Sequence, residues 1–574
     1  MTDRIITVSI SGSGGSGAVT AGLVLLKSMA NAGFYGHLSR FSGPQIRGGE
    51  SAVIVSFSDQ SIERSADITD FHFALDWHGF ERFGDEISLD KSSRIIYDNA
   101  REKLPDVVAK IGAEIIEVNL HEEARKLKGS RPNTFAIGII AAQIGLPFHA
   151  VLKALQQILG KKDEDIAINI LDAAKIGYQL LEKEDSLIEN WQPNFKSRWN
   201  ISGNEACALG ALRGGIKLVA AYPITPASDI VEYLAPRLEK AGGSVMIAED
   251  ELAAMNMIIG SSFGGKPSMT ATSGPGFSLM IEAMGLAIAS ETPVLVVNVM
   301  RGGPSTGLPT KSEQSDLNQA LFGMHGEAPH VVVAPLSISD NVLTTQWAVG
   351  LAEALQTLVV LLSDQRIGQS RVIIDAVPAK EYGLKRKILT EKEFGQPYKR
   401  YAGTPDNITP MAIPGNECGR YTADGLEHTT TGKPSSAASD HLQQLEKRNN
   451  KITQFEYGEE WAEVLKADQE SQMVVLTWGS TFGNVKQAVL ELNKEGYSIE
   501  LLALRLLMPL QVDEIKKLCK GKQVIVVEQS YSGQFYHYCL GQGAITNSAL
   551  LLAKPGPLVL KTSEIKDFIK GVQV

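Results

Sequence analysis

The chain has 574 residues, 44% hydrophobic and 21% charged, which is typical of a soluble globular protein with several domains. Its net charge of −10, without a basic tract interleaved with aromatic residues, argues against nucleic-acid binding as its main role. The apolar stretches are too short for a membrane span and no apolar leader precedes the first expected strand, so we expect a cytoplasmic protein.

The first region begins with a predicted buried strand over 4–11 and a predicted helix over 18–32. Between them, Gly12-Ser13-Gly14-Gly15-Ser16-Gly17 fits the G-x-G-x-x-G pattern of a helix N-terminus that binds phosphate. A nicotinamide site would need an acid about 20 residues further on, and residues 34–40 contain none, which disfavours NAD. Ordinary glycine packing between strand and helix is the alternative, and both interpretations stay open.

A second motif, Tyr222-Pro223-Ile224-Thr225-Pro226, closes a predicted strand over 217–221. Each proline fixes its own φ and keeps the preceding residue out of the helical region, so we expect Thr225 on a stiff loop. In open α/β sheets, ligands bind at the carboxyl ends of the strands. A helix is expected from about 229 to 239, and capping of that helix by Thr225 or Ser228 is the alternative role.

Three acids, Glu249-Asp250-Glu251, separate a predicted strand over 244–248 from a predicted helix over 252–263. The helix dipole stabilises a carboxylate in the first turn by about 0.3–1 kcal/mol, so capping explains one or two of these acids. Capping does not require three acids. We therefore expect one of them to have another task.

A third motif, Arg301-Gly302-Gly303-Pro304-Ser305-Thr306-Gly307-Leu308-Pro309-Thr310, follows a predicted strand that is apolar except for Asn298. An arginine at the carboxyl end of a strand can hold a substrate carboxylate in a bidentate pair, with about 1.5–3 kcal/mol for each charged hydrogen bond. The alternative is a structural arginine that holds its own loop in place.

In this order, the Y-P-I-T-P and R-G-G-P-S-T-G-L-P-T motifs closely resemble the α subunit of the 2-oxoacid:ferredoxin oxidoreductases. These thiamine-diphosphate enzymes decarboxylate 2-oxoacids and pass the electrons to ferredoxin. Nearer the N-terminus, Gly43-Pro44-Gln45-Ile46-Arg47-Gly48-Gly49 resembles the glycine-arginine loop of the family's γ domain, and departs from its common form at Gln45 and Ile46. The resemblance implies a γ domain fused ahead of an α subunit.

This resemblance, together with the alternation of apolar and helical stretches, predicts a multidomain α/β protein. Its regions are a γ domain over 1–190, a doubly wound pyrimidine-binding domain over 195–385, an extended polar arm or linker over 386–458, and a transketolase C-terminal-like domain over 459–574. In the second region the expected strands are 217–221, 244–248, 268–272, 293–300, 330–334 and 358–362. In the last region they are 473–478, 498–504 and 523–528.

The resemblance also implies roles for the motif residues. Glu251, nine residues before Gly260, is expected at the aminopyrimidine ring of thiamine diphosphate, with Glu249 as the second choice. Thr225 and Arg301 are expected to bind the 2-oxoacid, and these two residues and Glu251 form the predicted catalytic set.

Further residues are assigned to binding only. Thr310 is expected to line the substrate pocket, and Tyr222 and Pro223 are expected beside thiamine diphosphate. No residue is assigned to a metal. The candidate contacts of coenzyme A, a co-substrate rich in phosphate, are Gly14, Gly15, Gly17 and Arg47.

Two features that the chemistry needs are missing from the sequence. The closest pair among Cys207, Cys418, Cys519 and Cys539 is twenty residues apart, which gives no iron–sulfur or zinc motif. The G-D-G sequence that holds magnesium and diphosphate in thiamine enzymes is also absent. In the resembled family a β subunit carries both, so we expect a partner with Mg²⁺ and a [4Fe-4S] cluster, an (αβ)₂ heterotetramer, and ferredoxin as electron acceptor.

The expected reaction is the oxidative decarboxylation of 2-oxoglutarate with coenzyme A to succinyl-CoA and CO₂. In reverse, the same enzyme would fix CO₂ by the reductive carboxylation used in a reductive TCA cycle. The alternatives are a broad-range or pyruvate-type enzyme of the same family, a non-redox thiamine-diphosphate enzyme subunit, and a non-catalytic scaffold subunit. His325 and the stretch Ser273-Gly274-Pro275-Gly276 stay outside the catalytic set.

Overall fold

The computed structural model describes residues 4–43, 49–100, 102–160, 164–182, 186–390, 398–417 and 419–572. The chain divides into two compact units, and both have the predicted α/β architecture. The first unit comprises Met1–Ser202, Gln369–Val377 and Lys561–Ser563. The second comprises Gly203–Gly368, Pro378–Leu560 and Glu564–Val574.

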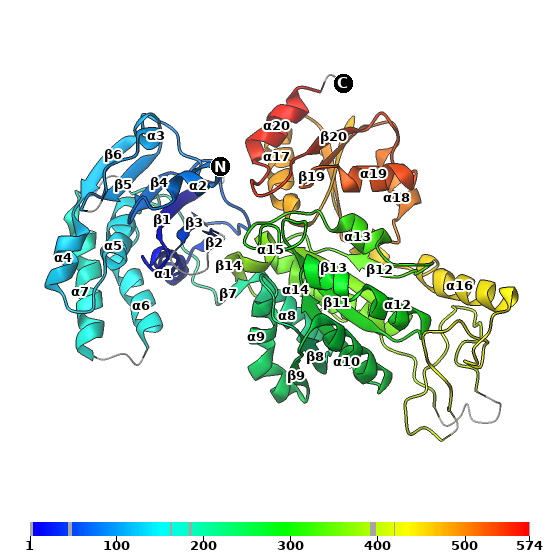
Figure 1. The fold of residues 1–574 in the computed structure, drawn as a ribbon. Helices are drawn as coiled ribbons and strands as arrows, with labels where there is room; N and C mark the ends of the chain where they lie inside the picture. The colour runs from blue at the N-terminus through cyan, green and yellow to red at the C-terminus, as the bar shows by residue number, and fades with distance from the viewer. Residues whose placement is uncertain are drawn as a thin grey trace. The chain divides into compact units, whose positions relative to one another are not determined.

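The first unit contains a mixed eight-stranded sheet in the order β6-β5-β4-β1-β3-β2-β14-β7 (Figure 1). Its strands are β1 (Ile6–Ser13), β2 (Tyr35–Ser42), β3 (Glu50–Ser58), β4 (Phe71–Ala74), β5 (Arg94–Asp98), β6 (Glu114–Val118), β7 (Arg198–Ser202) and β14 (Arg371–Asp375). Its helices are α1 (Ala18–Asn31), α2 (Phe80–Phe83), α3 (Asp106–Ala109), α4 (Leu120–Lys126), α5 (Pro132–Ile144), α6 (Phe148–Leu159) and α7 (Glu164–Leu180). The alternate residues Ile6, Val8 and Ile10 are fully buried in the core with α1, α5, α6 and α7.

Two strands of this sheet come from distant parts of the chain. β14 pairs antiparallel with β2 and with β7, although β7 and β14 both fall inside the range predicted for the pyrimidine-binding domain. Arg198 and Asp375, 177 residues apart in sequence, are joined by a 3.2 Å ion pair. Strand–helix alternation along a sequence cannot indicate pairing over such a distance.

The second unit contains a seven-stranded sheet in the order β18-β12-β13-β11-β10-β8-β9. All its strands are parallel except β18. The parallel strands are β8 (Leu218–Ala221), β9 (Ser244–Ile247), β10 (Ser268–Thr272), β11 (Val294–Met300), β12 (Val331–Val333) and β13 (Leu358–Asp364). These are the six strands predicted from apolar runs, to within a few residues at each end.

Helices cover both faces of this sheet, as a doubly wound fold requires. On β11, Leu295, Val297 and Val299 belong to a core shared with α8 (Gly203–Gly214), α9 (Ser228–Leu238) and α14 (Ile338–Leu355). Val294, Val296 and Met300 face the opposite way, into a core shared with α10 (Glu251–Phe263), α12 (Ile281–Ala289) and α13 (Leu317–Phe322). Two short helices, α11 (Gly274–Leu279) and α15 (Gln365–Gln369), follow β10 and β13.

The C-terminal part of the second unit has a five-stranded sheet in the order β15-β17-β16-β19-β20. Its strands are β15 (Ala462–Leu465), β16 (Met473–Trp478), β17 (Ile499–Leu504), β19 (Gln523–Glu528) and β20 (Leu550–Ala553), and its helices are α17 (Phe482–Lys494), α18 (Val512–Cys519), α19 (Gln534–Gly541) and α20 (Thr562–Lys570). The intervening strand β18 (Leu506–Met508) leaves this sheet and pairs antiparallel with β12. The two sheets of the second unit are therefore joined by an edge strand.

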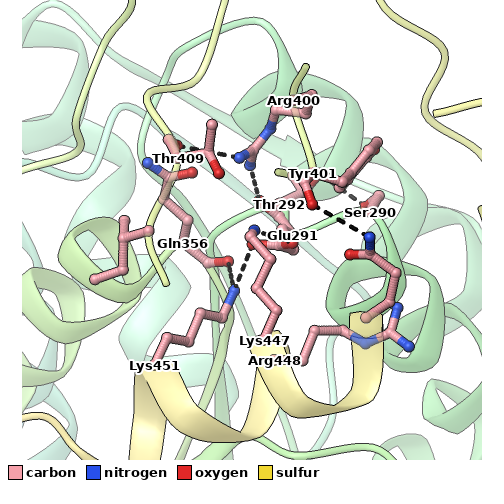
Figure 2. A network of polar contacts seen from close by, with 12 residues as sticks. Ser290, Glu291, Thr292, Gln356, Arg400, Tyr401, Thr409, Lys447, Arg448 and Lys451 are labelled. Carbon is pink, nitrogen blue, oxygen red and sulfur yellow. Dashed lines mark hydrogen bonds and ion pairs between the residues drawn. The ribbon is translucent and has the colours of Figure 1, made fainter. Parts of the chain in front are cut away.

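The range predicted as an extended polar arm contains a sixteen-residue helix, α16 (Ala438–Thr453). Figure 2 shows Lys447 and Lys451 pointing from α16 towards the buried carboxylate of Glu291, with Nζ–O distances of 2.5 and 3.0 Å. Arg400, also buried, donates to the backbone carbonyl of Glu291 at 2.7 Å. Because buried lysines and arginines face inward, α16 lacks the apolar periodicity that predicts an amphipathic helix.

Candidate functional site

Thr225 lies on the loop that follows β8. Tyr222 and Pro223 are exposed, and Thr225 is half-buried. The predicted capping role fails, because α9 starts at Ser228 without a side-chain cap and the hydroxyl of Ser228 donates back to the carbonyl of Ile224 at 3.2 Å. Thr225 is thus held on the loop at the carboxyl edge of the sheet without serving the helix.

Arg301 directly follows β11 and is only 6% exposed. Its Nη1 donates a 2.6 Å hydrogen bond to the backbone carbonyl of Thr225, and its buried Nε has no partner in the part of the chain that the structure describes. Burial lowers the pKa of Arg301, and the nearby carboxylate of Asp316 raises it in part. The arginine therefore spans two loops, rather than holding only its own, and keeps donor capacity for a ligand.

The loop after Arg301 folds back on itself. Gly302 accepts from the N–H of Leu308 at 2.8 Å and donates to the carbonyl of Lys311 at 3.0 Å. Gly307 has φ +50°, and a Cβ there would lie 2.0 Å from the carbonyl oxygen of Gly302, so the turn requires glycine. This closure brings the half-buried Thr310 back towards the start of the loop, where Arg301 lies.

The three acids at α10 have different environments. Asp250 is the N-cap and accepts from the N–H of Ala253 at 2.7 Å, while Glu249 is exposed. Glu251 is 6% exposed, and no donor to its carboxylate is found among the described residues. Capping accounts for Asp250 alone. The side chain of Glu251 is largely buried, but its carboxylate oxygens are not among the fully buried unpartnered atoms, so the carboxylate stays open to a ligand.

Close packing fixes the position of Glu251. A Cβ at Gly276, in α11, would lie 2.5 Å from Oε1 of Glu251 and 2.2 Å from the hydroxyl oxygen of Thr272. The carboxylate thus lies against the backbone of α11 at Gly276, close to the end of β10. Glycine at 276 is what makes room for it.

All of these groups share one edge of the sheet. Strand β10 lies between β8 and β11, and Thr272 at its end is in register with Asn298 of β11. Thr225 and Arg301 are in direct contact, while Glu251, which follows β9, lies beside Gly276 just after the intervening strand β10. The predicted catalytic set is therefore assembled around the carboxyl ends of three neighbouring strands.

Sequence reasoning missed several residues at this edge. Asn298 is fully buried and donates from Nδ2 to Oδ2 of Asp316 at 3.0 Å. Gln314, also fully buried, donates to the carbonyl of Trp478 at 2.9 Å and accepts from the N–H of Gln529 at 2.8 Å. Asn298 could have been found as the single polar residue of its strand. No local pattern indicates Asp316 or Gln314.

The glycine-rich loop of the first unit gives mixed evidence for a phosphate site. Gly17 is the N-cap of α1 with φ +91°, and a Cβ there would lie 2.3 Å from Nδ2 of Asn133, which supports a packing role. Gly15 has φ +93° and nothing within 4 Å of its Cβ position. Gly14 donates to the carbonyl of Gly49 at 2.5 Å. Arg47 lies outside the described residues, so both interpretations stay open.

Other candidate features lie elsewhere. His325 is exposed. A cavity of about 760 Å³ contains none of the predicted site residues, and its lining includes Met324, His330, Ile452, Met508 and Tyr538. Within the described ranges, no three His, Cys, Asp or Glu side chains cluster as metal ligands, and no helix is long and apolar enough to cross a membrane.

Three family models match the chain in sequence order. Residues 7–180 match the pyruvate ferredoxin/flavodoxin oxidoreductase model, and residues 209–447 match the thiamine-diphosphate-binding model of the pyruvate flavodoxin/ferredoxin oxidoreductases. Residues 462–534 match the transketolase C-terminal domain. These matches confirm the predicted fold classes, and the second match extends through most of the range predicted as a polar arm.

The similar proteins cover from 65% to 99% of the chain. A 2-oxoacid:ferredoxin oxidoreductase subunit alpha of Sulfolobus sp is 31% identical over 92% of this chain and 90% of its own. The 2-oxoglutarate synthase subunit KorA of Methanocaldococcus jannaschii is 33% identical over 65% of this chain and 99% of its own. The solved 2-oxoglutarate:ferredoxin oxidoreductase of Magnetococcus marinus, with 2-oxoglutarate, coenzyme A and succinyl-CoA bound, is 32% identical with a TM-score of 0.91 and 99% coverage of both chains.

Proposed function

Because the chain belongs to the family of 2-oxoacid:ferredoxin oxidoreductase α subunits, we propose that it supplies half of an active site for 2-oxoglutarate. The reaction is the oxidative decarboxylation of 2-oxoglutarate with coenzyme A to succinyl-CoA and CO₂, with ferredoxin as electron acceptor. The choice of 2-oxoglutarate rests on the similar proteins from Methanocaldococcus jannaschii and Magnetococcus marinus. The single observation that carries the site is Glu251, which is 6% exposed and whose carboxylate has no donor among the described residues.

Glu251 fits the pyrimidine ring of thiamine diphosphate chemically. A ring that covers this carboxylate would exclude water from it, and a proton shared with the ring nitrogen would offset the cost of burying the acid. Gly276 leaves room for the carboxylate, and Tyr222 and Pro223 are the proposed neighbours of the cofactor. When bound, thiamine diphosphate supplies the nucleophile that attacks the keto carbon.

Arg301 and Thr225 are the proposed groups for the 2-oxoacid. A guanidinium that already donates to the Thr225 carbonyl presents its remaining N–H groups in a fixed orientation, which favours a bidentate bond to a carboxylate. The arginine thereby orients the substrate before CO₂ leaves. Thr310, on the folded-back loop, is the proposed third side of this pocket.

The remaining parts of the reaction require a second chain. We propose a β subunit that brings Mg²⁺, the diphosphate site and a [4Fe-4S] cluster, in an (αβ)₂ heterotetramer. The scattered cysteines support this division, because single-electron transfer to ferredoxin needs an iron–sulfur centre and the sequence has no motif for one. The glycine loop at Gly14–Gly17 and Arg47 are the proposed phosphate contacts of coenzyme A.

Anaerobic co-purification of the chain with its partner tests the proposal. We expect iron and thiamine in the complex and reduction of methyl viologen with 2-oxoglutarate and coenzyme A, at a higher kcat/KM than with pyruvate. A preference for pyruvate would favour the pyruvate-type alternative. A complex without iron would contradict the redox function. For the coenzyme A site, Arg47→Ala should raise the KM for coenzyme A and leave the KM for 2-oxoglutarate unchanged.

A further inference from the structure

Asp316 occupies the N-cap position of α13, but its side chain does not cap the helix. It immediately precedes α13, where an aspartate commonly accepts a hydrogen bond from the first turn, but its side chain makes no such bond. Oδ2 instead accepts from Nδ2 of Asn298, the only polar side chain of β11. The carboxylate is therefore directed towards the strand ends and not towards its own helix.

Asp316 also acts on Arg301 without touching it. Its negative charge raises the pKa of Arg301, against the burial that lowers it. Burial and the negative charge of Glu313 raise the pKa of Asp316, and the hydrogen bond from Asn298 and the charge of Arg301 offset this only in part. Within the described residues, however, Arg301 donates only to Thr225, and its Nε stays unpartnered. The carboxylate of Asp316 lies close enough to raise the pKa of Arg301 but forms no ion pair with it in the described part of the chain.

The backbone on the other side of Asp316 packs closely against its carboxylate. A Cβ at Gly274 would lie 2.8 Å from Oδ2 and 3.3 Å from Oδ1 of Asp316. Asn298 therefore holds the carboxylate by donation, and Gly274 provides the space in which it lies. Nothing in this arrangement serves the helix that Asp316 precedes.

We propose that Asn298 and Asp316 are positioning residues that set how tightly Arg301 binds the substrate carboxylate, with Asn298 holding Asp316 near the guanidinium but out of contact. This inference rests on the proposed role of Arg301. Held in this way, Asp316 leaves the donors of Arg301 free, and it weakens anion binding because like charges repel in a partly buried site. The repulsion disappears when the carboxylate departs as CO₂, so it favours the reaction over the bound ground state.

Ligand binding to the co-purified complex, measured by calorimetry, tests this proposal without turnover. The probe is N-oxalylglycine, a non-reacting analogue of 2-oxoglutarate, and its dimethyl ester is the uncharged comparison. Asp316→Asn keeps an acceptor for Asn298 but removes the charge, and it should tighten N-oxalylglycine binding by about tenfold. Binding of the ester should not change, and KM and kcat for 2-oxoglutarate should both fall, the pattern of lost ground-state repulsion.

A matched control and an opposite variant sharpen the test. Glu327→Gln removes the same charge from an exposed position and should leave N-oxalylglycine affinity unchanged. Asn298→Leu releases Asp316 to pair with Arg301 and should weaken binding by roughly tenfold, and adding Asp316→Asn should reverse the loss. If the leucine variant does not assemble, Asn298→Ser takes its place, because a serine hydroxyl is too short to hold the carboxylate.

The results distinguish a failure of the tuning role of Asp316 from a failure of the proposed function of the site. Unchanged or weaker N-oxalylglycine binding in Asp316→Asn overturns the tuning role while leaving the function of the site intact. The tuning role is also overturned if adding Asp316→Asn to Asn298→Leu does not restore N-oxalylglycine affinity. If Arg301→Lys binds N-oxalylglycine as tightly as the wild-type complex does, the proposed function itself is contradicted, and the tuning role with it.

Discussion

Nη1 of Arg301 donates a 2.6 Å hydrogen bond to the backbone carbonyl of Thr225, which joins the loops after β11 and β8 across the carboxyl edge of one sheet. Two motifs 76 residues apart in sequence are thereby held in a single arrangement. The bond links the proposed substrate anchor to a loop that carries another proposed substrate group. Changes to the guanidinium should therefore affect both.

Arg301→Lys should lower kcat/KM for 2-oxoglutarate by about 100-fold, because one ammonium cannot serve the Thr225 carbonyl and form a bidentate bond to the substrate. Viologen reduction at varied 2-oxoglutarate concentration measures the effect. The control is Arg237→Lys, which changes an exposed arginine on α9 that donates to its own helix. An unaltered KM in Arg301→Lys would exclude the anchor role.

Gly276→Ala should inactivate the enzyme by at least tenfold, because the new methyl group would meet the Glu251 carboxylate at 2.5 Å and the Thr272 hydroxyl at 2.2 Å. Thiamine content after gel filtration should fall together with activity. The matched control is Gly285→Ala in α12, where the nearest atom is 3.7 Å away and belongs to His325. Equal behaviour of the two variants would show that the position of Glu251 is unimportant.

Gln314→Leu should loosen the segment that follows the Arg301 loop. It leaves the buried N–H of Gln529 unpaired, at a cost of about 1–3 kcal/mol, and leaves the carbonyl of Trp478 with the hydroxyl of Thr481 as its remaining donor. We expect a lower melting temperature and a higher KM for 2-oxoglutarate. Gln469→Leu, at an exposed position, should change neither quantity, and a melting temperature of Gln314→Leu equal to wild type would refute the link.

Lys451→Met should change how stability depends on pH. Burial lowers the pKa of Lys451 to about 7, although Glu291 raises it in part, against 10.5 for an ordinary lysine. Between these values the unfolded chain binds a proton that the folded chain lacks, so the contribution of Lys451 to stability rises with pH, by about 1.4 kcal/mol for each unit of pKa difference. The neighbouring Lys447 and Arg400 stay in place in this variant.

Differential scanning calorimetry at pH 7 and pH 9.5 measures this effect. The melting temperature of wild type should rise relative to that of Lys451→Met as the pH increases. Lys517→Met removes a lysine whose side chain is 78% exposed, and its difference from wild type should be the same at both pH values. A constant difference for Lys451→Met as well would contradict the shifted pKa.

The six parallel strands of the larger sheet of the second unit, together with β16, β17 and β19, were predictable because most are apolar runs that end in turn residues. The short edge strands β15, β18 and β20 were not predicted. The strand over 268–272 is found with the predicted bounds, and the one over 293–300 starts one residue later. The membership of β7 and β14 in the sheet of the first unit was not predictable, since pairing between distant segments leaves no local pattern. The helix α16 was missed because its buried side includes Lys447 and Lys451.

The site was predictable only as far as its motifs extend. Thr225, Glu251 and Arg301 stand out because proline, acid and arginine occur at strand ends, where few structural tasks require them. The surrounding residues are set by tertiary packing. Asp316 looks like a helix cap in sequence, and only its contact with Asn298 reveals another direction for its side chain.

The most direct measurement is the turnover of Glu251→Gln in the complete complex, with Glu249→Gln as the matched control at an exposed neighbouring position. The glutamine keeps the size of the side chain but cannot exchange a proton with the pyrimidine ring. Both variants should assemble normally with unchanged iron content, and viologen reduction should fall at least 100-fold in Glu251→Gln and stay unchanged in Glu249→Gln. Wild-type turnover in Glu251→Gln would show that this carboxylate takes no part in catalysis.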